Sequence, residues 1–200
     1  MRGEMAAAVE SVRILGIAGS LRRESYNRRL LAAARELASE SMQIEVFELA
    51  PIPLYNADFD TDDERPAAVV QLKRAIAEAD GLLIVTPEYN HSVPGVLQNA
   101  IDWASRPGGR SPFVGKPAGI IGASQGAIGT ARAQQQLKLV LYSTFAIVMP
   151  HGGVTVARAQ DKFDASGTLT DEPTREFLKA YLRQLLDWTL RLRSTAERAS

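Results

Sequence analysis

The distribution of apolar and polar positions changes along the chain between two patterns, one typical of strands and one typical of helices. Short apolar runs rich in branched residues predict strands, and apolar residues three and four positions apart predict helices with one buried face. The predicted strands are residues 12–18, 43–49, 81–86, 118–123 and 144–148. The predicted helices are residues 27–39, 67–79, 94–104, 128–142 and 172–193.

This alternation predicts an α/β fold, because parallel neighbouring strands need a crossover helix between them. Right-handed crossovers favour a five-stranded parallel sheet of order 2-1-3-4-5, the flavodoxin-like three-layer sandwich. We predict a single domain over residues 12–193, with an N-terminal tail at 1–11 and a C-terminal tail at 194–200. Ligands of such sheets bind beyond the carboxyl ends of the strands, so the loops after strands one, three and four are candidates for the site.

Composition excludes several classes of function. The 23 Lys and Arg residues balance the 23 Asp and Glu residues, which gives no general attraction to nucleic acid or to an anionic membrane. The absence of cysteine excludes disulfides, thiolate metal sites and a cysteine nucleophile. His91 and His151 show no metal-ligand spacing, so no metal site is expected. The N-terminus lacks a signal-peptide pattern and no apolar run approaches the ~20 residues of a membrane span, so we expect a cytoplasmic protein.

The loop after the first strand is a candidate anion site. It leads from a buried strand into a helix N-terminus, where free N–H groups and the helix dipole favour negative charge. Ser20 and Ser25 offer hydroxyls, Asn27 an amide and Arg22 a full charge, a set that suits a terminal phosphate better than a diphosphate. Neither GxxxxGK[ST] nor GxGxxG occurs here. The residues alone leave open a solvated turn with a Ser or Asn helix cap.

The loop after the third strand is rigid and polar. Two prolines restrict its backbone, Tyr89 offers an aromatic face, and Asn90 offers donor and acceptor groups, as a planar heteroaromatic ligand needs. Alternatively, Asn90 and Ser92 only cap the next helix. Glu88 and His91 are either acid–base groups or solvated side chains. The glycine-containing turn at 122–130 allows close approach to a ligand, but such turns also occur without one.

Taken together, GSLRRESYN, TPEYNHSVPG, QNAIDW and GASQGAIG resemble the NADPH-dependent FMN reductase family, and within it the bacterial quinone and chromate reductases. The resemblance spans about residues 12 to 192. It implies FMN as cofactor and NADPH or NADH as co-substrate. It also implies three sets of cofactor contacts. The FMN phosphate loop would contribute Ser20, Leu21, Arg22, Ser25, Tyr26 and Asn27. The isoalloxazine loop would contribute Pro87, Glu88, Tyr89 and Asn90, and a third turn near the flavin would contribute Ser124, Gln125 and Gly126.

The activity implied by this resemblance is hydride transfer from a nicotinamide through FMN to small electron acceptors, with ping-pong kinetics. Quinones, chromate, azo dyes, free flavins and ferric chelates are the expected acceptors. Because the flavin performs the chemistry, we assign no catalytic acid or base. The resemblance also implies a homodimer or homotetramer with helices 94–104 and 128–142 near the interface. Helix 94–104 carries Val96, Leu97, Ile101 and Trp103, which would contribute to that interface or alternatively pack in the core.

Three other functions remain open from the sequence. A flavodoxin-type carrier would hold FMN without turning over nicotinamide, although such carriers are typically acidic and this chain is neutral. An arsenical-resistance flavoprotein has a similar first loop. A binding or regulatory domain would need no flavin at all.

Overall fold

A computed structural model describes residues 11–108, 110–150 and 152–199 of the chain. Its strands are β1 (Val12–Ala18), β2 (Met42–Phe47), β3 (Gly81–Val85), β4 (Pro117–Ala123), β5 (Ile147–Val148) and β6 (Val154–Val156). Its α-helices are α1 (Tyr26–Leu37), α2 (Ala67–Glu78), α3 (Gly95–Ala104), α4 (Ala131–Ser143) and α5 (Glu172–Ala199). The predicted tail at 1–11 lies outside the described residues, except for Ser11. None of the helices in the described part is both long and apolar enough to cross a membrane.

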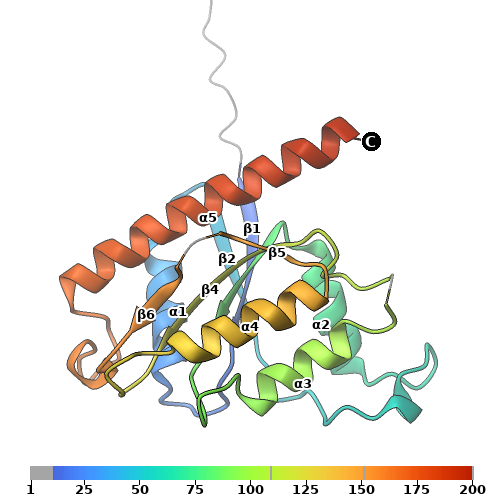
Figure 1. The fold of residues 1–200 in the computed structure, drawn as a ribbon, viewed down its shortest axis with the longest axis horizontal. Coiled ribbons are helices and arrows are strands. Elements are labelled where there is room, and N and C mark those ends of the chain that lie inside the picture. Colours follow the sequence, from blue (N-terminus) through green and yellow to red (C-terminus); the bar gives the residue numbers. More distant parts are fainter. Residues whose placement is uncertain (1–10, 109, 151, 200) are drawn as a thin grey trace, which may run out of the picture.

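The predicted fold is confirmed. All strand pairs are parallel and the order is β2-β1-β3-β4-β5, with β6 as an additional strand beside β4. Helices α1 and α5 cover one face of the sheet, and α2, α3 and α4 cover the other (Figure 1). The side chains of β1 point to both faces of the sheet. Val12 and Ile14 pack on the side of α1 and α5, and Leu15 and Ile17 pack on the side of α2, α3 and α4.

The sheet edge differs from the prediction. The fifth strand was predicted at residues 144–148, but β5 contains only Ile147–Val148, and β6 lies in a region that was predicted as a loop. Strand β5 pairs with the start of β4, and β6 pairs with its end. This edge of the sheet is therefore made of two short strands, β5 and then β6, which follow one another in the sequence.

A helix cap explains why the fifth strand starts late. The amide of Phe145 donates to the carbonyl of Tyr142, and the amide of Ala146 donates to that of Leu141. These two bonds form a Schellman motif, in which Phe145 occupies the left-handed position at φ 64° that usually favours glycine. Residues 144–146 therefore end α4 and cannot join the sheet.

Tyr181 fills the gap between the two edge segments. Its hydroxyl accepts a hydrogen bond from the amide of Ile120 at 2.8 Å and donates one to the carbonyl of Ile120 at 3.1 Å. Ile120 lies between the β4 residues that pair with β5 and those that pair with β6. A side chain of α5 thus takes the place of a strand partner.

The C-terminal helix is longer than predicted. We expected it to end at Arg193 and residues 194–200 to form a tail, but α5 continues to Ala199. The polar composition of these residues suggested a tail. In the structure Ser194 and Thr195 instead donate side-chain hydrogen bonds back to the carbonyl of Arg191, as helix-surface residues do.

Candidate active site

The loops after β1, β3 and β4 meet at the carboxyl edge of the sheet, which faces the bottom of Figure 1. They surround a cavity of about 300 Å³. Its lining consists of Ser20, Arg22, Ser25, Tyr26, Asn27, Pro87, Glu88, Tyr89, Ala123, Ser124 and Gln125. The predicted site residues Leu21, Asn90 and Gly126 are next to these residues in the sequence but do not line the cavity. Most residues singled out from the sequence therefore lie around one cavity.

The first loop forms a polar pocket at the start of α1. Ser25 is the N-cap residue, and its hydroxyl accepts a hydrogen bond from the amide of Asn27 at 3.2 Å. Ser20 is also buried, with its hydroxyl 3.4 Å from that of Tyr89 on the second loop. The guanidinium of Arg22 lies 5.9 Å from the ring centre of Tyr26. Two buried hydroxyls, one cation and a helix N-terminus thus converge on one end of the cavity.

Asn27 lines the cavity and also makes a contact that the sequence did not predict. Its side-chain amide donates to the carbonyl of Ala123 at 2.8 Å, and its side-chain oxygen accepts from the amide of Ala123 at 2.8 Å. The side chain is buried and pairs with the backbone of Ala123 in β4 as a residue of a neighbouring strand would. Asn27 therefore joins the first loop to the third.

The second loop contains a tight turn between Tyr89 and Ser92. Each of these two residues donates its amide to the carbonyl of the other, at 3.2 and 3.0 Å. The residues between them, Asn90 and His91, have φ values of 51° and 61°, which are uncommon for residues with a side chain. The turn leaves the aromatic ring of Tyr89 half exposed beside the first loop.

The carboxylate of Glu88 is fully engaged. It accepts hydrogen bonds from the backbone amides of Arg132 and Ala133, at 3.0 and 3.1 Å, in the first turn of α4. Burial raises the pKa of Glu88, but the Ala133 amide, His91 and the Arg132 amide outweigh burial and hold this pKa below its usual value. Glu88 is therefore ionised near neutral pH and is poorly suited to donate a proton.

The third loop is shaped by backbone contacts. The hydroxyl of Ser124 accepts a hydrogen bond from the amide of Gly126 at 3.1 Å, and the Gly126 carbonyl accepts one from the amide of Arg158. A side chain at Gly122 would collide with the carbonyl of Thr86 and the hydroxyl of Thr130. A glycine is needed at this point because β3 and the start of α4 approach β4 so closely.

Three contributions to the site were missed from the sequence. Ala123 lines the cavity and holds Asn27, and it could have been found as the last residue of a strand that ends at the site. Phe163 packs its ring 5.6 Å from that of Tyr26, and the first turn of α4 binds Glu88. The sequence carries no local signal for either contact.

The parallel sheet order β2-β1-β3-β4-β5, with helices on both faces, defines the flavodoxin-like class of α/β proteins. The family model described as NADPH-dependent FMN reductase matches residues 12–161. The chain is 46% identical over 184 residues to an NAD(P)H-dependent FMN reductase of Pseudomonas aeruginosa, covering 92% of this chain and 98% of that protein. It is 42% identical over 178 residues to a 2-hydroxy-1,4-benzoquinone reductase of a Burkholderia species, covering 89% and 96%.

A solved structure gives the same result. The flavoenzyme NAD(P)H:(acceptor) oxidoreductase FerB of Paracoccus denitrificans superposes with a TM-score of 0.79 at 37% sequence identity, covering 90% of this chain and 98% of that chain. The chain therefore belongs to the NADPH-dependent FMN reductase family, and its class is that of flavin-dependent oxidoreductases.

Proposed function

We propose that this protein is an FMN-dependent NAD(P)H:quinone oxidoreductase. The observation that carries the proposal is the cavity at the carboxyl ends of β1, β3 and β4, where a phosphate-type pocket lies beside a rigid polar loop. The names of relatives at 42% and 46% identity support a nicotinamide donor and a quinone acceptor. A carrier role without nicotinamide turnover is not favoured.

The donor set of the first loop fits the phosphate of FMN. Ser20 and Ser25 supply buried hydroxyls, Arg22 supplies a positive charge, and the start of α1 supplies backbone amides. A monoester phosphate has three oxygens that accept such bonds. We propose that these residues, with Leu21, Tyr26 and Asn27 around them, bind the phosphate end of the cofactor.

The second and third loops would bind the ring system. When bound, FMN would supply the redox chemistry, which is hydride transfer from the nicotinamide and electron transfer to the acceptor. We propose that Pro87, Tyr89 and Asn90 orient the ring, while backbone amides near Ser124 and Gln125 stabilise negative charge on its polar edge. Because Glu88 is bound to α4, no side-chain acid is assigned. The nicotinamide and the electron acceptor are expected to use one site in turn.

A visible spectrum tests the proposed function directly. Purified protein is expected to contain or take up FMN, and anaerobic NADPH or NADH is expected to bleach the flavin band within the time of mixing. Subsequent addition of a benzoquinone restores the band. Slow or absent bleaching would instead indicate a carrier, and protein that does not take up FMN would contradict the proposal.

The phosphate pocket has its own test. The double variant Arg22→Ala, Ser25→Ala removes one charge and one buried hydroxyl and is expected to raise the FMN dissociation constant at least about a hundredfold, since each strong bond contributes about tenfold or more. Arg23→Ala is the matched control, because it is the next residue and is also exposed. Equal FMN affinity in the double variant and the control would refute the assignment.

Of the two helices expected near an interface, we propose self-association through the end of α4 and not through α3. Leu97, Ile101 and Trp103 of α3 are buried within the core of one chain, so the core alternative is correct for them. Three strongly exposed apolar side chains lie together at and just after the end of α4, where Leu139, Tyr142 and Phe145 are 72%, 78% and 71% exposed. These three residues also line a groove of about 970 Å³ beside β5.

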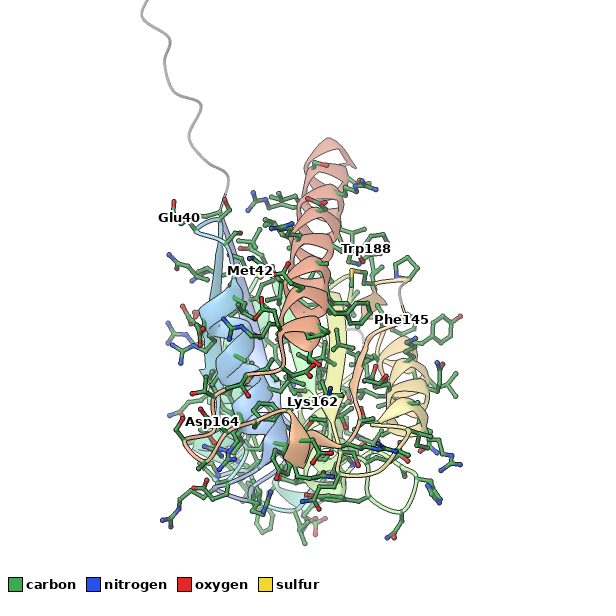
Figure 2. The ribbon with its side chains drawn as sticks, turned by 90° about the vertical axis from the view of Figure 1, so that its left-hand side faces the viewer. Glu40, Met42, Phe145, Lys162, Asp164 and Trp188 are labelled. Carbon is green, nitrogen blue, oxygen red and sulfur yellow. The ribbon has the colours of Figure 1, made fainter. Side chains whose placement is uncertain are left out.

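Phe145 allows a specific test of this surface. It lies on the same side of the molecule as Trp188 of α5 (Figure 2) and keeps a left-handed conformation that glycine adopts more easily. Phe145→Gly is expected to stabilise the folded chain by roughly 1 kcal/mol and to shift the protein towards monomers in sedimentation experiments. An unchanged homodimer or homotetramer would rule out this surface.

Other expectations stay predictions. They include chromate, azo dyes, free flavins and ferric chelates as further acceptors, a cytoplasmic location, and one FMN-binding domain over residues 12–193. Steady-state assays with each acceptor and with both nicotinamides would test the first of these.

A further inference from the structure

The second loop is attached to α4 by two rows of contacts. In the first row, the carboxylate of Glu88 accepts the amides of Arg132 and Ala133, and its side chain is only 8% exposed. In the second row, the Ser92 hydroxyl donates to the side-chain oxygen of Gln136 at 2.6 Å, and the Gln136 amide donates to the His91 carbonyl at 3.2 Å. Both ends of the Tyr89–Ser92 turn are therefore tied to one helix.

Glu88 takes the place of a helix cap. The residue that begins α4, Thr130, makes no capping bond through its own side chain. Its hydroxyl instead accepts a hydrogen bond from the side chain of Gln134. The free amides of the first turn are thus bound by a carboxylate from another loop, whose charge also interacts favourably with the helix dipole.

The turn that these contacts hold is costly in itself. Asn90 and His91 both have positive φ values, and residues with a side chain adopt that region at a cost of about 1–3 kcal/mol each where they are strained. Such a conformation persists only when the surroundings determine it. The contacts from α4 are the surroundings that do so.

We infer that Glu88 is a positioning residue of the FMN site, which holds the 87–92 loop on α4 so that Tyr89 and Asn90 are presented to the cofactor in one conformation. The inference rests on the proposed function, because it concerns the binding of FMN to that loop. It separates the role of Glu88 from cofactor contact or proton transfer. The carboxylate acts through α4, and Gln136 acts in the same way from outside the cavity.

Gln136 provides the test that a purely structural role would fail. It is exposed on α4 and is not part of the cavity lining, so Gln136→Ala removes no contact with the cofactor. Alanine is also a good helix former, so thermal unfolding of the variant is expected to match the wild type. FMN release from diluted holoenzyme, followed by recovery of flavin fluorescence, is expected to show a dissociation constant raised about threefold. Gln135→Ala, the same residue type exposed on the same helix, is the matched control.

Glu88→Gln tests the carboxylate itself. It keeps the shape of the side chain and removes the charge, and we expect an FMN dissociation constant about tenfold above wild type. Its control is Asp171→Asn, because Asp171 is also a carboxylate at a helix start: it precedes α5, accepts the amide of Thr174 at 3.1 Å and pairs with Lys162, away from the cavity. Both substitutions are expected to lower the unfolding temperature, but only Glu88→Gln weakens FMN binding.

Two results would overturn the inference. One is wild-type FMN affinity in Glu88→Gln, and the other is equal FMN affinity in Gln136→Ala and Gln135→Ala. If Glu88→Gln does not fold, the comparison of the two glutamine variants decides alone. Wild-type protein that binds no FMN contradicts the proposed function instead, so the two failures are distinguishable.

Discussion

Removing the hydroxyl of Tyr181 isolates one of the contacts that complete the sheet. The side chain is buried, and its hydroxyl binds both the amide and the carbonyl of Ile120. In Tyr181→Phe the ring remains and packs as before. The two polar groups of Ile120 then lose a partner in a position that neither β5 nor β6 reaches.

The expected loss of stability follows from these two groups. A buried donor or acceptor left without a partner costs about 1–3 kcal/mol, so two such groups cost about 2–6 kcal/mol together. Domains are stable by only about 5–15 kcal/mol in total, so the effect is a large part of the free energy of unfolding. Urea unfolding of the apoprotein measures this quantity with little extrapolation error between similar variants.

Tyr142→Phe, measured at a dilution where the chain is monomeric, is the matched control, because Tyr142 is 78% exposed in the single chain and the substitution changes the same atom. We expect less than about 0.5 kcal/mol for this control. A loss below about 1 kcal/mol in Tyr181→Phe, or an equal loss in both variants, would show that Ile120 finds other partners. The reasoning about the divided sheet edge would then be wrong.

The same contact predicts a dependence on alkaline pH. Burial raises the pKa of the Tyr181 hydroxyl well above its ordinary value, and the hydrogen bond from Ile120 offsets only part of this rise. In the unfolded chain the hydroxyl ionises near pH ~10. Its contribution to stability is therefore complete below about pH 10 and declines as the pH rises further. The stability gap between wild type and Tyr181→Phe should shrink above that pH.

Three further substitutions or conditions test the site. Asn27→Ala leaves the amide and carbonyl of Ala123 without partners, so it is expected to cost about 2–6 kcal/mol in urea unfolding and to weaken FMN binding. Stability unchanged within error would contradict the contact. Gly122→Ala forces a methyl group against the Thr86 carbonyl, so the free energy of unfolding is expected to fall by about 1–3 kcal/mol or more. Thermal unfolding measures this loss, and wild-type stability would disprove the close approach. The lowered pKa of Glu88 means that its contribution to stability is present above about pH 4.3 and is lost as the pH falls through its folded-state value. In acid unfolding, the stability difference between wild type and Glu88→Gln should therefore shrink as the pH falls below about 4.3.

The sequence by itself determined the order of the elements and the edge of the sheet where the site lies. Five strand-like segments, each followed by a helix-like one, leave few topologies for a parallel sheet. That topology brings the carboxyl ends of β1, β3 and β4 together, so the loops at residues 19–27, 86–95 and 122–130 could be combined into one site. Periodicity reports which positions are buried, and this information was enough for the layers of the sandwich.

Only the tertiary structure decided how the loops are held. Asn27 binds Ala123 across 96 positions of the chain, Glu88 binds the amide of Arg132 across 44, and Tyr181 binds Ile120 across 61. In each case a side chain takes a backbone partner on another element. A sequence pattern shows that such a residue is polar, but the identity of its partner depends on distances that exist only after the sheet has formed. For this reason the sequence showed Asn27 and Glu88 as candidate ligand contacts, and only the structure showed that they also connect the loops.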